Sequence, residues 1–182
     1  MKQRVLLSVA ALVAAGSIVA AQAPAAQGNL SGTRADLLYQ FDDASGKIAQ
    51  LANAVGQDKY AYRPGAGVRS MSEVFMHVVG GNYYLLTFIG VKPAKALPQN
   101  AETTVTNKAQ IATMLKESFD HVRAAIIAAS DADLDKPATM FGRQTTVRNV
   151  YLTTVTHAHE HLGQLIAYAR INNVVPPWSM GN

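Results

Sequence analysis

Three of the chain's five histidines lie close together in the sequence, at His157, His159 and His161. Consecutive residues of an α-helix are rotated by about 100°, so His157 and His161 point to within roughly 40° of each other, whereas His159 points about 160° away. Two histidines four residues apart on a helix can bind the same metal ion. The spacing therefore predicts His157 and His161 as ligands of one site, with His159 as a solvent-facing neighbour of Glu160.

His77 is the third predicted ligand. It lies three residues after Val74 and four before Gly81, on the apolar side of a predicted helix, and Gly81 is expected to leave room beside its ring. Three inward, neutral imidazoles suit a divalent ion such as Zn, Ni, Fe or Co and leave coordination positions open for water or substrate. An ion in such a site could activate water or polarise a carbonyl group. Taken singly, an inward histidine is more often a hydrogen-bonded core residue than a ligand, and His121 receives only that interpretation.

Two further polar residues share the face of the histidine pair. Gln164 follows His161 by three positions and could orient a ligand ring, or make an ordinary interhelical hydrogen bond. Tyr168 could line the same cavity, or simply pack in the core. No acidic residue stands out as a base, because Glu160 points away and Glu73 is assigned to a helix cap. This pattern slightly favours Lewis-acid or thiol activation over hydrolysis that needs a side-chain base.

Apolar residues recur at helical spacing in four stretches of the sequence, which must position these side chains. The first stretch covers 30–55 and ends at Gly56. The second begins at about Met71, because Ser70 and Glu73 have the spacing of a capping box. We expect it to stop before the glycine at position 90 and the proline at position 93.

The third predicted helix runs from Thr106 or Asn107 to about Ser130, and the fourth from Thr145 or Thr146 to about position 173. The connection between them is interpreted as a loop, because it is rich in Asp and contains a glycine. No strand-like alternation of useful length competes with the helices. We therefore predict an all-α fold, a four-helix bundle with antiparallel or crossover connections.

The first 23 residues have the order of a secretory signal peptide. Lys2 and Arg4 precede an almost wholly apolar stretch at 5–21, and small residues follow. We expect cleavage after Ala23, with Ala21 as the alternative. An uncleaved membrane anchor is the other possibility, since about 17 apolar residues are the lower limit for crossing a bilayer. The sequence thus predicts export to the periplasm or the medium.

Length and composition favour a single domain. The 182 residues are 49% hydrophobic, enough for one core, and we place a flexible lead at 24–31 and a bundle domain at 32–178. Without Lys2 and Arg4, 14 basic residues face 12 acidic ones, and no basic run is interleaved with aromatic residues. We therefore exclude nucleic acid as a partner. The absence of cysteine excludes disulfides and thiolate ligands, so any thiol chemistry needs an imported thiol.

The order of His77, His157 and His161, followed by Gly163-Gln164, resembles the DinB/YfiT-like superfamily of four-helix metalloenzymes. The resemblance covers most of the chain after the signal peptide. Its supporting pieces are Tyr62-Arg63-Pro64 before the second helix, Ser70 seven residues before His77, and Ala169-Arg170 followed by Pro176-Pro177. It implies crossover connectivity, a divalent metal (Zn, Ni or Fe) held by the three histidines, and frequent homodimers.

The resemblance also implies a class of function, because some members of the superfamily are S-transferases or isomerases that use a small thiol. We therefore expect a metal-dependent hydrolase or a thiol-dependent transferase that acts on a small molecule. Two features depart from that pattern: His159 offers an alternative ligand, and export removes the chain from most low-molecular-weight thiols. The alternatives are a non-catalytic module that binds a metal or small ligand in the cell envelope, and a structural bundle without a ligand.

Overall fold

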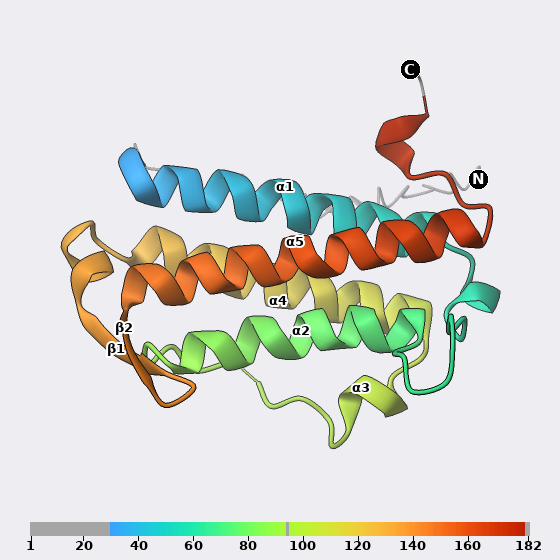
Figure 1. The fold of residues 1–182 in the computed structure, drawn as a ribbon, viewed down its shortest axis with the longest axis horizontal. Helices are drawn as coiled ribbons and strands as arrows, with labels where there is room; N and C mark the ends of the chain where they lie inside the picture. The colour runs from blue at the N-terminus through green and yellow to red at the C-terminus, as the bar shows by residue number, and fades with distance from the viewer. Residues whose placement is uncertain (1–29, 94, 181–182) are drawn as a thin grey trace, which may run out of the picture.

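Four long helices form the body of the molecule (Figure 1). The computed structural model describes residues 30–93 and 95–180, so the predicted signal peptide and most of the predicted lead lie outside the described residues. The helices are α1 (Gly32–Ala54), α2 (Met71–Thr87), the short α3 (Ala101–Thr104), α4 (Lys108–Ala128) and α5 (Val147–Ile171). Within the described residues, no helix is both long and apolar enough to cross a membrane.

Short-range polar contacts fix the starts of three of these helices. The Ser70 hydroxyl accepts a hydrogen bond from the Glu73 N–H (3.3 Å), and the Glu73 carboxylate accepts one from the Ser70 N–H (2.7 Å). Asn107 and Thr146 cap α4 and α5 in the same way, each accepting from a backbone N–H three residues later. The predicted capping box is thus confirmed, and so are the predicted starts of these helices.

The order of the helices around the bundle requires a crossover. Helices α1 and α2 each pack against both α4 and α5. Although α1 and α2 are consecutive in the chain, they therefore lie diagonally opposite each other in the bundle. Figure 1 shows that α2 and α4 run in the same direction, opposite to α1 and α5. The connection at 88–107 must therefore return along the bundle, and it carries α3 past the beginning of α2. This is the crossover connectivity that the family resemblance implies.

A small hairpin replaces part of the loop expected before α5. Strand β1 (Pro137–Met140) pairs antiparallel with β2 (Arg143–Thr146). The two residues between them, Phe141 and Gly142, both have positive φ angles (52° and 76°), as a type I′ hairpin turn requires. Asn-Gly is the usual sequence of such a turn, and the aromatic first residue concealed it. Helix α3 was not predicted either.

The packing between α2 and α4 contains a buried polar pair. Asn82 and Ser118 are fully buried, and the Asn82 side-chain amide donates a hydrogen bond to the Ser118 hydroxyl (3.0 Å). That hydroxyl in turn donates to the Leu115 carbonyl oxygen (2.9 Å). Nearby, the rings of Tyr83 and His121 contact each other with centroids 5.1 Å apart. Apart from these groups, the helices meet mainly through apolar side chains.

Candidate metal centre

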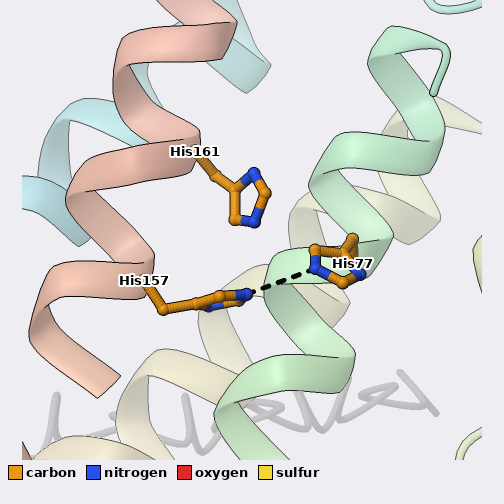
Figure 2. Close-up of side chains that lie close together, drawn as sticks. All are labelled: His77, His157 and His161. Carbon is orange, nitrogen blue, oxygen red and sulfur yellow. Dashed lines mark hydrogen bonds between the residues drawn. The ribbon is translucent and has the colours of Figure 1, made fainter. Parts of the chain in front are cut away.

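Three histidine rings converge between α2 and α5 (Figure 2). His77 extends from α2, and His157 and His161 extend from successive turns of α5. The ring centroids are 4.5–5.2 Å apart, and one nitrogen from each ring lies within 4.8 Å of the other two. His161 is only 6% exposed, while the other two are half-buried. The structure thus brings together the three side chains that the sequence predicted as ligands.

One pair of ring nitrogens has the separation expected for two ligands of one ion. The Nε2 atoms of His77 and His157 are 3.3 Å apart. Two imidazole nitrogens, each about 2.0–2.1 Å from a tetrahedral ion, lie about 3.3 Å from each other. The same distance is at the long end for a hydrogen bond. Three imidazoles are also a donor set that suits borderline divalent ions, so the residues present fit a metal.

Burial keeps the imidazoles of His157 and His161 in the form that binds metals. It lowers the pKa of His157 to about 4, with further contributions from His161, His77 and Arg69. Burial also lowers the pKa of His161, although its hydrogen bond with Gln164 opposes the change. Both rings are therefore neutral at pH 7. A neutral imidazole has a lone pair available for a metal, whereas a protonated ring has none.

Gly81 makes room for one of the rings. A Cβ atom at this position would lie 2.3 Å from Cε1 of His157 and would collide with the ring. We expected Gly81 to make room for His77 on its own helix, and that assignment was wrong. The ring of His157 extends from α5 into the space beside Gly81 on α2, so the missing side chain of Gly81 makes room for a residue of the opposite helix.

The two residues predicted to surround the site hold the outer side of His161. The Nδ1–H of His161 donates to the Gln164 side-chain oxygen (2.9 Å). The Gln164 amide then donates to the Tyr168 hydroxyl (2.9 Å), which itself donates to the Arg69 carbonyl oxygen (3.1 Å). This chain of hydrogen bonds fixes the ring orientation and leaves its Nε2 free to face the other two rings.

An acidic residue that was not predicted from the sequence lies beside His77. Nδ1 of His77 lies 3.0 Å from Oε2 of Glu102, and Oε1 of Glu102 accepts a hydrogen bond from Arg69 Nε (2.6 Å). Burial raises the pKa of Glu102, but the hydrogen bonds from Arg69 and His77 outweigh it, so the net pKa lies below its ordinary value. Glu102 belongs to α3, whose position depends on the path of the crossover. Helical periodicity contains no information about that path.

The remaining histidines lie elsewhere. His159 is half-buried rather than solvent-facing, and its Nδ1–H donates to the Val155 carbonyl oxygen on its own helix (2.9 Å). His121 contacts Tyr83 on the other side of α2, and burial lowers its pKa. Within the described residues, His77, His157 and His161 are the only group of three or more histidine or acidic side chains that lie close enough together to hold a metal ion.

Comparisons with known proteins agree with this architecture. Two crystal structures of DinB-like proteins have a similar fold. One, from Bacillus cereus, is 17% identical, with a TM-score of 0.66 over 78% of this chain and 93% of that chain. The other, from Bacillus subtilis, is 19% identical, with a TM-score of 0.62 over 77% of this chain and 93% of that chain. No functionally curated protein matches the chain. The sequence profile of the DinB superfamily matches residues 40–165, and the chain therefore belongs to the DinB superfamily.

Proposed function

We propose that this chain is an exported protein that holds a divalent metal ion through His77, His157 and His161 and acts with it on a small molecule. The observation that carries the proposal is the convergence of three ring nitrogens from two helices, one pair of them 3.3 Å apart. The metal sites implied by the family resemblance support it. Export rests on the charge-apolar-small order of residues 1–23.

The chemistry follows from the number and type of ligands. Three protein ligands leave at least one coordination position open, and the ion would act there as a Lewis acid toward an oxygen or sulfur atom of the substrate. The chain has no cysteine, so a thiol in the reaction would have to be a small molecule. Glu102, the carboxylate beside His77, already accepts hydrogen bonds from Arg69 and His77. This arrangement favours activation by the metal over proton removal by a side chain, in either a thiol-dependent transferase or a hydrolase.

Elemental analysis tests the metal site directly. Protein purified from its native compartment without chelators should contain about one equivalent of a divalent metal ion. His77→Ala, His157→Ala and His161→Ala should each reduce that content strongly. The matched control is His159→Ala, which removes an imidazole from the same helix and should leave the metal content unchanged. A wild-type protein free of metal would refute the proposal.

Activity measurements then separate an enzyme from a binding module. Turnover of a member of a thiol-acceptor or ester panel, abolished in His161→Ala, would establish catalysis. Full metal content without turnover would favour the alternative, a non-catalytic module that holds a metal or a small ligand in the cell envelope. Intact-mass analysis of the exported protein should give a chain that begins near residue 24. Full-length protein in the cytosol would refute export.

A further inference from the structure

The outer nitrogens of the three candidate ligands have different partners. Nδ1 of His77 meets the Glu102 carboxylate, and Nδ1 of His161 meets the neutral Gln164 amide. Nδ1 of His157 is buried without a hydrogen-bond partner among the described residues. His77 is thus the one ligand of the three with an anion behind it.

We propose that Glu102 is a positioning residue for the metal site, which holds His77 in the Nδ1–H tautomer so that the Nε2 lone pair faces the ion. The proposal rests on the proposed function, because it concerns the same three histidines. It adds a residue from the crossover connection to a site whose ligands all come from the bundle helices. Arg69 has a supporting part, since its guanidinium holds the carboxylate in place.

The tautomer follows from the chemistry of the pair. An ionised carboxylate can only accept hydrogen bonds, so His77 must donate to it from Nδ1. When the His77 ring is neutral it has one N–H, and its Nε2 then keeps the lone pair, 3.3 Å from Nε2 of His157. A carboxylate behind a histidine ligand also makes the ring more basic toward the metal.

The position of the Glu102 carboxylate, rather than a strong ion pair, allows it to orient the His77 ring. The side chains of Glu102 and His77 are 36% and 28% exposed, so water reaches both and weakens their Coulomb attraction. The contact depends instead on where α3 lies and on the short bond from Arg69 Nε to the other carboxylate oxygen (2.6 Å). With one oxygen held by Arg69, the other is directed at His77.

Arg69 connects the outer partners of two ligands. Its guanidinium binds Glu102 behind His77, and its carbonyl oxygen accepts from Tyr168. The hydrogen bonds continue through Gln164 to His161. The loop before α2 therefore joins the supports of a ligand on α2 and a ligand on α5. Displacement of Glu102 should consequently weaken metal binding more than the loss of an isolated surface charge.

Nuclear magnetic resonance of the metal-free mature protein tests the tautomer. Long-range ¹⁵N correlation spectra distinguish an Nδ1–H imidazole from an Nε2–H imidazole. Wild-type protein in chelator should have His77 as the Nδ1–H tautomer, and Glu102→Ala should convert much of it to the Nε2–H form. The matched control is Glu160→Ala, which removes an exposed carboxylate adjacent to His161 and should leave the tautomer of His77 unchanged.

Zinc titration against a chromophoric chelator measures the consequence. Glu102→Ala should still bind one Zn²⁺ but about 10–100-fold more weakly, the usual effect of losing the outer partner of a histidine ligand. Glu102→Gln, which keeps an acceptor oxygen, should have an intermediate affinity. Glu160→Ala should bind as the wild type does. If Glu102→Ala fails to fold, Arg69→Gln should show a smaller loss of the same kind, because it frees the carboxylate without removing it.

The outcomes separate this inference from the proposed function. Failure of the wild-type protein to bind zinc would overturn the proposed metal site itself, irrespective of residue 102. If the wild type binds one zinc ion, an unchanged His77 tautomer or an unchanged zinc affinity in Glu102→Ala would overturn the role of Glu102. An unchanged His77 tautomer in Glu102→Ala would contradict that role even if the zinc affinity of this variant were reduced, because the reduced affinity would then have another cause.

Discussion

Helix α2 packs against α4 on one side and against α5 on the other. Both contacts contain polar side chains, but these side chains are arranged differently in the two contacts. Toward α4, the amide of Asn82 donates to the hydroxyl of Ser118, so a donor meets an acceptor. Toward α5, ring nitrogens of His77, His157 and His161 converge on a common point. Polar groups that pair in this way help to hold a core together, although the Asn82 side-chain oxygen is buried without a hydrogen-bond partner among the described residues. Ring nitrogens that converge, with the outer nitrogens of two of the three rings hydrogen-bonded elsewhere, indicate a place for a cation.

The same contrast separates the histidines themselves. His121 lies against Tyr83 near the α2–α4 contact, and its Nε2 is buried without a hydrogen-bond partner among the described residues. Within the described residues it belongs to no group of three or more possible metal ligands, so it resembles a core histidine rather than a ligand. Burial alone therefore does not identify a metal ligand, whereas the geometry of several side chains does.

The largest expected effect comes from closing the gap on α2. Gly81→Ala places a Cβ atom where the His157 ring lies, so the ring must turn away from His77. We expect metal content to fall as far as in His157→Ala, while circular dichroism shows an intact helical fold. The measurement is metal stoichiometry after dialysis against zinc and removal of free ion.

The adjacent glycine is the matched control for this change. A Cβ atom at Gly80 meets no atom within 4 Å, so Gly80→Ala should retain full metal content. It should also stabilise the helix by roughly 0.5–1 kcal/mol, because alanine loses less backbone entropy than glycine. Equal metal loss in both variants would mean that α2 tolerates no substitution here, and the specific clash would not be the cause.

A smaller effect is expected at the α2–α4 contact. Ser118→Ala leaves the buried amide of Asn82 without an acceptor, which should lower the free energy of unfolding by about 1–3 kcal/mol. Metal content should not change. Urea denaturation measures the loss, and the double change Asn82→Leu with Ser118→Ala should recover much of it because no buried donor remains. A metal-deficient Ser118→Ala protein would contradict the independence of the two contacts.

The smallest effect concerns the pH dependence of stability through His121. Around its ring lie Tyr83 from α2, Lys95 from the crossover, and Glu117 and Asp120 on its own helix. Burial lowers the pKa of His121 in the folded protein, so the unfolded chain takes up a proton first as the pH falls below about 6.5. Folding stability must then decrease below that pH.

Replacement of this histidine should make the protein less sensitive to acid. Urea midpoints of wild type and His121→Gln, measured in chelator between pH 7.5 and 5.5, should diverge as the pH falls, with the variant losing less. The difference should be small beside the Ser118 effect. A wild-type midpoint that falls no faster than that of the variant would show that His121 is not destabilised by burial.

The sequence allowed the bundle to be predicted because most of its information is local. The helix starts at Ser70, Asn107 and Thr146 depend on side chains within three residues. The convergence of His157 and His161 depends only on helical geometry. The place of His77 opposite them followed from the apolar stripe of α2 and from the family resemblance.

Features that depend on tertiary structure were missed or assigned wrongly. Glu102 reaches the site because the chain returns alongside α2, and no local pattern encodes that return. The role of Gly81 required knowledge of the opposite helix. Phe141 concealed a hairpin because an aromatic residue is unusual at a positive φ angle.

The crossover past α2 also makes the two parts of the site separable in evolution. The three ligands lie on helices whose sequences are constrained by the core, whereas Glu102 lies on a short helix in a connection. A replacement of that connection that keeps the buried Ala101 and Val105 would therefore change the partner of His77 without altering the sequences of the four long helices. Grafting crossover segments between family members would then measure how strongly the partner of His77 affects the proposed metal site.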